Sequence, residues 1–174
     1  MAQVGWIFNE RRCIGCRACY VACKAENNTP LRTDRRWVLE RESGAFPEVK
    51  REFISLTCNH CKEPACMKSC PERAISKRAS DGVVLIDQDK CVGCRYCVAV
   101  CPYGAPKINT KTNKADKCTM CIHRLDAGLL PACATVCLTG AIQYIPDFTY
   151  AVDAVPEGFV DPVYTQPNIN FILM

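Results

Sequence analysis

The chain has 174 residues, a length that suits one compact domain or two small ones. Apolar residues make up 49% of it, but the fraction falls to about 40% without the 16 cysteines, which is lean for a domain held by side-chain packing alone. The formal net charge is +4, and the N-terminal MAQVGWIFNERRC has neither the basic nor the apolar region of a secretory signal, which argues against an exported disulfide scaffold.

The first predicted element is a short apolar strand that runs into a dense group of cysteines. In WIFNERRCIGCRACYVAC (6–23) a polar turn separates that strand from four cysteines with the spacing C-x2-C-x2-C-x3-C. Two-residue gaps let one loop curl around a cube and present three thiolates to three of its corners, while the three-residue gap puts the fourth cysteine on the following helix. This first group consists of Cys13, Cys16, Cys19 and Cys23.

Residues 24–57 contain RRWVLERE, then SGAFPE, then VKREFISL, a pattern that predicts a β-hairpin with a loose turn. We expect the hairpin to cover a bound group, with contact to a partner protein as the alternative. The pairs Arg11-Arg12 and Arg35-Arg36 resemble a twin-arginine export signal only by letter, because neither precedes a hydrophobic segment.

The middle of the chain holds two more cysteine groups, separated by about 20 residues that include the predicted strand GVVLI (82–86). The second group has the spacing C-x2-C-x4-C-x3-C. The third repeats the first spacing and ends in Cys101-Pro102, the run that holds a [4Fe–4S] cluster in bacterial ferredoxins. VLIDQDKCVGCRYCVAVC (84–101) aligns with residues 6–23 without gaps, which indicates a duplicated unit. The two groups are Cys58, Cys61, Cys66 and Cys70, and Cys91, Cys94, Cys97 and Cys101.

The fourth group has the spacing C-x2-C-x11-C-x3-C and consists of Cys118, Cys121, Cys133 and Cys137. Residues 70–75 resemble residues 137–142, and each stretch marks the end of a helix that returns to a strand. The most apolar run, residues 129–145, is interrupted by Pro131, polar residues and two cysteines, so we expect no direct membrane insertion.

The tail, residues 146–174, has four prolines, five aromatic residues, four acidic residues and no lysine or arginine. Such a tail is too apolar to be a solvated disordered arm. Either it wraps the chain's own surface, or it docks an extended strand onto a neighbour. We expect self-wrapping, with a contribution to an interface.

Three kinds of cysteine chemistry compete for these groups. Disulfides need a pair geometry that cysteine triplets do not favour, and an oxidising compartment for which the sequence has no signal. Structural zinc uses four ligands, usually on two C-x2-C knuckles, and fits at most the second and fourth groups taken alone. Iron–sulfur clusters account for all 16 cysteines, and bound metal also compensates for the lean core.

The pairing of the groups follows from the rule that the fourth cysteine of a two-cluster ferredoxin ligates the other cluster. The second and third groups then form an inner unit, and the first and fourth groups form an outer unit around it. The alternative is that all four cysteines of each group ligate the same cluster. The predicted sets are Cys13, Cys16, Cys19 and Cys137; Cys58, Cys61, Cys66 and Cys101; Cys91, Cys94, Cys97 and Cys70; and Cys118, Cys121, Cys133 and Cys23.

This pairing predicts an α+β fold of two interleaved bacterial-ferredoxin-like units, each with two [4Fe–4S] clusters. The outer unit would comprise residues 1–23 and 107–146, and the inner unit residues 58–106. A hairpin insertion at 24–57 and an extended tail at 147–174 complete the chain.

Four residues in the cysteine loops are candidates for tuning a bound cluster. Gly15 and Gly93 let loop amides approach the sulfurs closely. Arg17 and Arg95, at equivalent positions of the repeat, either offset negative charge or point into solvent. An oxidised cluster with four thiolates carries −2, so four clusters bring the formal net charge from +4 to −4 and remove the basis for a nucleic-acid partner.

No residue pattern indicates a substrate site. The glycine patterns that bind dinucleotides or nucleotide phosphates are absent from the sequence, so flavin and nicotinamide binding have no support. His60 and His123 are not needed as ligands beside 16 thiolates, and we expect ordinary surface roles for both. The chain is therefore expected to conduct electrons without catalysing a reaction.

The cysteine plan, with TCNHCKEPAC (57–66), KCVGCRYCVAVCPYGAP (90–106) and KCTMCIHRLDAGLLPAC (117–133), resembles the iron–sulfur subunits of molybdenum and tungsten pterin oxidoreductases. These include subunits of dimethyl sulfoxide, polysulfide and tetrathionate reductases and of formate dehydrogenases, and the small subunit of bacterial tungsten aldehyde oxidoreductases. Some relatives have tryptophan at the position of Cys94, and the cysteine here implies four [4Fe–4S] clusters. Lys24 and Leu138 replace the usual proline, so we expect the outer helices to start differently.

The resemblance implies a relay of single electrons between a molybdenum- or tungsten-pterin catalytic subunit and a further redox subunit or soluble acceptor. Stacking of several copies of this chain is a further possibility. A free polyferredoxin is the alternative function, and a zinc-binding interaction module is a remote one. We expect a cytoplasmic location, with export on a partner's signal and membrane association through a partner as the alternative.

Overall fold

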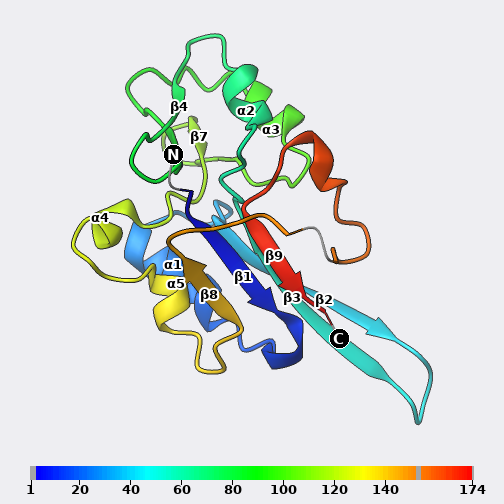
Figure 1. Ribbon diagram of the computed structural model, residues 1–174. Helices are drawn as coiled ribbons and strands as arrows, with labels where there is room; N and C mark the ends of the chain where they lie inside the picture. The colour runs from blue at the N-terminus through cyan, green and yellow to red at the C-terminus, as the bar shows by residue number, and fades with distance from the viewer. Residues whose placement is uncertain (1–2, 152–153, 174) are drawn as a thin grey trace.

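The computed structural model describes residues 3–151 and 154–173, which form short helices and small sheets (Figure 1). The helices are α1 Ala18–Asn27, α2 Ala65–Lys68, α3 Tyr96–Val100, α4 Ile122–Leu125 and α5 Ala132–Thr135, with 3-10 turns at Glu10–Arg12 and Pro162–Tyr164. The strands are β1 Gly5–Asn9, β2 Arg36–Ser43, β3 Lys50–Thr57, β4 Ile75–Lys77, β5 Val84–Ile86, β6 Lys107–Ile108, β7 Ala115–Asp116, β8 Ile142–Ile145 and β9 Ile169–Ile172. In this part of the chain, no helix has the length and apolar character needed to cross a membrane.

Strand β1 is the centre of the main sheet. Its apolar side chains alternate, so Trp6 and Phe8 are buried on one face. β8 pairs with it antiparallel and β9 pairs with it parallel, which places Ile142 and Phe171 on either side of Phe8. Because β9 belongs to the C-terminal tail, the prediction that the tail wraps the chain's own surface is confirmed for this strand.

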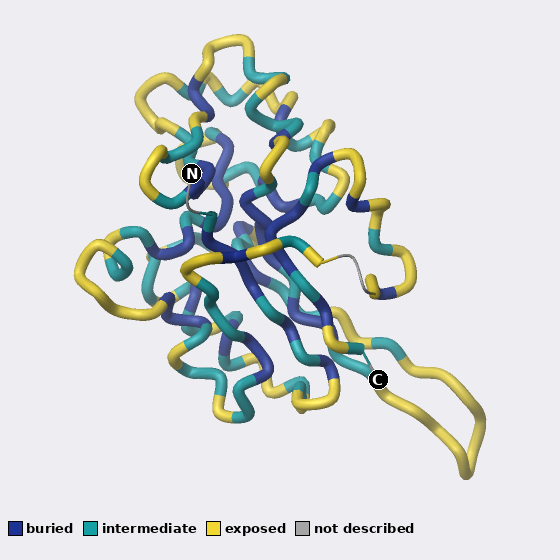
Figure 2. The backbone as a smooth tube through the Cα atoms, in the orientation of Figure 1, coloured by how far each residue is buried: buried dark blue, intermediate teal, exposed yellow. Residues whose placement is uncertain are grey.

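The predicted hairpin is present as β2 and β3, which pair antiparallel from Arg36 opposite Thr57 to Ser43 opposite Lys50. Its base is buried and its far end is exposed, as Figure 2 shows. Phe46 in the connecting turn is 92% exposed, whereas Ile54 near the base is 1% exposed. The hairpin therefore contributes its base to the core and extends its tip away from the rest of the molecule.

The two repeated cysteine loops lead into helices that start alike and end differently. Arg17 and Arg95 immediately precede α1 and α3, both with left-handed backbone, so the expectation of different helix starts is wrong for α1. The two helices differ at their C-terminal ends, because a proline follows the fourth cysteine of the third group and a lysine follows that of the first. α3 ends at Val100 because the residue before Pro102 adopts extended backbone, whereas Lys24 supplies an amide and α1 continues to Asn27.

The packing divides into one large core and smaller cores in which cysteine makes up a larger share of the buried residues. The large core joins β1, β8 and β9 to the base of the hairpin, through Trp6, Phe8 and Ile54 among others. A smaller core lies under α3 and the β4–β5 hairpin, in the upper part of Figure 1, and consists of Ile75, Val84, Cys97 and Ala115. Assignment of these parts to two interleaved ferredoxin-like units stays a prediction.

Candidate metal centres

The loops that carry the first and third cysteine groups share a left-handed turn. Gly15 has φ +67° and Gly93 has φ +72°, and the arginine two residues later is also left-handed in both loops. Residues of this conformation turn the loop back so that its amides point inward. The backbone of Gly15 lowers the pKa of the Cys13 thiol against the larger effect of burial, and a tuning role for this glycine stays a prediction.

Replacing Gly93 by alanine is expected to destabilise the protein beyond the cost of its φ angle. A Cβ at this position would lie 2.3 Å from the backbone oxygen of Asn113, so backbone must move. Gly128 is a matched control, because its φ is +74° and a Cβ there would meet nothing within 4 Å. We expect G128A to cost about 1–2 kcal/mol of unfolding free energy and G93A on the order of 3 kcal/mol or more, measured by denaturant unfolding of the iron-loaded chain. Equal costs would contradict this interpretation of the loop.

No disulfide joins any of the 16 cysteines, and the fold gathers them from distant parts of the sequence. Cys16, Cys19 and Cys137 lie close enough to Cys13 for their charges to raise the pKa of its thiol, and we call cysteines related in this way electrostatic neighbours. Cys97 has Cys91, Cys94 and Cys70, and these four line one cavity beneath α3.

The other two sets are gathered deeper in the protein. Cys23 on α1 has Cys118, Cys133 and Cys121 as electrostatic neighbours, and these four line a second cavity. Cys61 has Cys58, Cys101 and Cys66. The structure thus brings together the same cysteines that the sequence analysis groups, while their assignment as ligands of particular clusters stays a prediction.

Burial makes these thiols poor anions when no metal is bound. Burial first, and neighbouring cysteines second, raise the pKa of Cys61 and Cys66 to about 12. The same causes raise the pKa of Cys97 to about 11, and burial raises that of Cys133 to about 11. Metal ions provide the positive charge that such crowded thiolates need, because the thiolate is the form that binds metal. The donor set therefore fits iron–sulfur clusters.

Two buried cations lie beside these thiols, and the sequence pattern did not predict the burial of either. Arg36 at the start of β2 is 3% exposed and lies near Cys19, Cys23, Cys118 and Cys133. Lys117 is 2% exposed, and its charge lowers the pKa of Cys58 and Cys66 against the larger effect of burial.

Lys117 is held by backbone carbonyls. Its Nζ donates to the carbonyl oxygens of Val84 and, at 3.1 Å, of Cys118. A buried ammonium is costly unless it is compensated. Thiolate clusters would supply that compensation, which is a second sign that the donor set suits a negatively charged group.

The two histidines differ from each other. His60 is completely buried, so a surface role is wrong for it. Its Nδ1 accepts a hydrogen bond of 3.0 Å from the amide of Val84, and burial and the charge of Lys117 hold its pKa well below the usual value. His123 is exposed, in agreement with the expected surface role, and its Nε2 lies 2.7 Å from Oε1 of Glu26.

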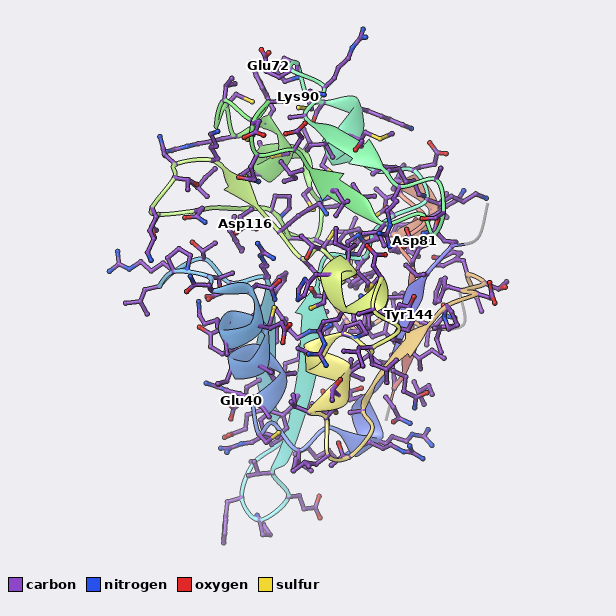
Figure 3. All side chains as sticks on the ribbon, turned by 90° about the vertical axis from the view of Figure 1, so that its left-hand side faces the viewer. Glu40, Glu72, Asp81, Lys90, Asp116 and Tyr144 are labelled. Carbon is purple, nitrogen blue, oxygen red and sulfur yellow. The ribbon has the colours of Figure 1, made fainter. Side chains whose placement is uncertain are left out.

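The predicted tuning arginines are both exposed. Arg17 pairs at 3.3 Å with Glu40 of the hairpin, which Figure 3 labels at the left, in the lower half of the molecule. Arg95 lines the cavity of Cys70, Cys91, Cys94 and Cys97. A tuning role for either residue stays a prediction.

The thiol sets also follow one another through the molecule. Cys66 is an electrostatic neighbour of Cys97, which links the set containing Cys101 to the set beneath α3. Cys58 is a neighbour of Cys118 in the same sense, and Cys133 is a neighbour of Cys19. These electrostatic interactions are consistent with one order of the sets, from the cavity beneath α3, through the two deeper sets, to the loop of Cys13.

A family profile described as "4Fe-4S dicluster domain" matches residues 49–146. Together with the thiol sets, this match defines the chain as an iron–sulfur protein of mixed helix and strand with a ferredoxin-type domain. The matched segment contains the second, third and fourth cysteine groups.

Curated relatives have similar sequences over most of the chain. A tetrathionate reductase subunit of Salmonella typhimurium is 48% identical over 75% of this chain and 53% of its own length, so the chain spans about half of that relative. A selenate reductase subunit of Mesobacillus selenatarsenatis is 34% identical over 98% of this chain and 72% of its own length. An anaerobic dimethyl sulfoxide reductase subunit of Escherichia coli K12 is 38% identical over 96% of this chain and 87% of its own length. The protein belongs to this family of 4Fe–4S subunits of reductases, which transfer electrons and are not themselves catalytic.

Proposed function

We propose that the chain carries four [4Fe–4S] clusters and relays single electrons between a molybdenum- or tungsten-pterin catalytic subunit and a second redox partner. The observation that carries this proposal is the gathering of four thiols from separate segments in each of four places. When bound, each cluster supplies a one-electron carrier whose potential depends on charge, hydrogen bonds to sulfur and solvent exposure. The proposed ligand sets are Cys13, Cys16, Cys19 and Cys137; Cys58, Cys61, Cys66 and Cys101; Cys70, Cys91, Cys94 and Cys97; and Cys23, Cys118, Cys121 and Cys133.

In this proposal the chain's residues do three things. They hold the four sites in one order, they limit the access of water to the two middle sites, and they expose one site at each end. Cys16 and Cys94 are exposed. In the two middle sites Cys23, Cys58, Cys118, Cys121 and Cys133 are buried, and Cys61, Cys66 and Cys101 are half-buried. The end sites would therefore exchange electrons with partners, and the middle sites would connect them.

The surface around each end thiol favours contact with another protein. Ile14 and Val92, each in the loop beside the exposed thiol, are 63% and 65% exposed. A partner that covered either loop would remove this apolar side chain from water, which favours docking there. The relatives are named as subunits of reductases, which supports a catalytic subunit as one partner. The cellular location would then follow that partner: the cytoplasm, unless the partner carries an export signal.

Two interleaved ferredoxin-like units remain the best description of the proposed architecture. The outer unit would comprise residues 1–23 and 107–146, and the inner unit residues 58–106. Each unit would exchange its fourth cysteine between its two clusters, as two-cluster ferredoxins do. The hairpin at 24–57 supports the interior of the outer unit through Arg36 and Ser55.

Elemental analysis of the complex, purified anaerobically from its native host, tests this function. We expect about 16 irons per copy of this chain, at four per cluster, together with stoichiometric molybdenum or tungsten. Sixteen irons with neither metal would favour the free polyferredoxin instead. Zinc in place of iron would overturn the proposal and favour the interaction module.

A further inference from the structure

Arg36 is a buried cation that lines the cavity of one thiol set and reaches a second set through Ser55. It is the first residue of β2, at the base of the hairpin, where its side chain lies against the ring of Trp6 with its guanidinium carbon 4.9 Å from the ring centroid. Nη1 donates a hydrogen bond of 2.9 Å to Oγ of Ser55. These contacts fix the guanidinium in one position.

The surroundings of Arg36 lack the usual counter-charge. Its neighbour Arg35 pairs with Asp116 at 2.8 Å, and Figure 3 labels that carboxylate above α1. Among the described residues no ion pair includes Arg36, and its buried Nη2 has no hydrogen-bond partner. An unpaired buried guanidinium is strongly unfavourable, so a negative group must complete this site.

That negative group has to come from the cysteine sites on either side. Arg36 lines the cavity of Cys23, Cys118, Cys121 and Cys133. On its other side, Oγ of Ser55 bridges Arg36 to Cys19, with 3.5 Å between that oxygen and Sγ of Cys19.

We propose that Arg36 is shared between these two neighbouring clusters and raises the reduction potentials of both. The inference rests on the proposed four-cluster function. A fixed positive charge favours the state that holds one more electron, and the effect is large where water is excluded. One guanidinium would thus shift the potentials of two adjacent carriers in the same direction, so that neither is raised without the other.

Redox titration of the full chain, produced anaerobically with its clusters and followed by electron paramagnetic resonance, tests the proposal. We expect Arg36→Met and Arg36→Gln each to lower two of the four potentials, by at least tenfold in the one-electron equilibrium, which is 59 mV. Arg36→Lys keeps the charge and should restore most of the shift. Arg51→Gln removes an equally charged but exposed residue from the same hairpin and should move none of the four.

The outcomes separate this inference from the function on which it rests. Fewer than four clusters in the unmodified chain would contradict the proposed function. Four clusters whose potentials do not move in Arg36→Met or Arg36→Gln would overturn the role of Arg36 alone, as would a shift confined to one cluster. If both variants fail to assemble their clusters, assembly of Arg36→Lys would support a need for charge, and failure of all three would overturn it.

Discussion

Replacing Cys58 and Cys101 together by alanine is expected to remove no more iron than replacing either one alone. Both residues would be ligands of the same cluster, so each single variant should lose about four irons, and the double variant should also lose about four. The two cysteines lie 43 positions apart in the sequence, yet both are electrostatic neighbours of Cys61. The measurement is iron per chain after anaerobic purification.

The matched pair is Cys91 with Cys101, which lie in one sequence group. Because the proposed pairing puts them in different clusters, the double variant should lose about eight irons. If each group closed on its own cluster, the two results would be exchanged: eight irons lost from the first pair and four from the second. Retention of the remaining clusters in every single variant is the control for general misfolding.

The sequence predicts the cysteine loops and the strands around them well. The geometry of a cluster fixes the spacing of its cysteine ligands along a loop, and that spacing is directly visible in the sequence. The hairpin β2–β3 and the strand at Val84 both lie where the pattern places them. Helix ends were less predictable. The equivalent helices α1 and α3 differ in length because one proline differs between the repeats.

The sequence did not predict which charged residues are buried. Lys90 and Lys117 each precede the first cysteine of a C-x2-C pair, so local sequence treats them alike. Lys90 lies at the upper surface in Figure 3, 3.5 Å from Asp87, whereas Lys117 donates to a carbonyl of β5 inside the protein. Burial of a lysine or arginine depends on which distant segments pack over it, and residue spacing does not predict this packing.

Removing iron from the chain is expected to unfold one part of it before the other. The core beneath α3 has one cysteine among its four buried residues, and cysteines surround it, so little apolar packing remains there without metal. The core around Trp6 and Phe8 has 12 buried residues, of which two are cysteines. Aromatic contacts such as Phe8 with Phe171 strengthen it independently of metal.

Hydrogen exchange measured by mass spectrometry, before and after anaerobic chelation of iron, can separate the two parts. We expect amides of β4 and β5 to lose protection by roughly 100-fold or more, which corresponds to about 2.7 kcal/mol of local stability. Amides of β1 and β8 should change by less than about tenfold. A uniform loss across both sheets would mean that the clusters stabilise the whole chain as one cooperative unit. Unchanged protection in β4 and β5 would mean that side-chain packing alone holds this part, against the lean apolar composition of the sequence.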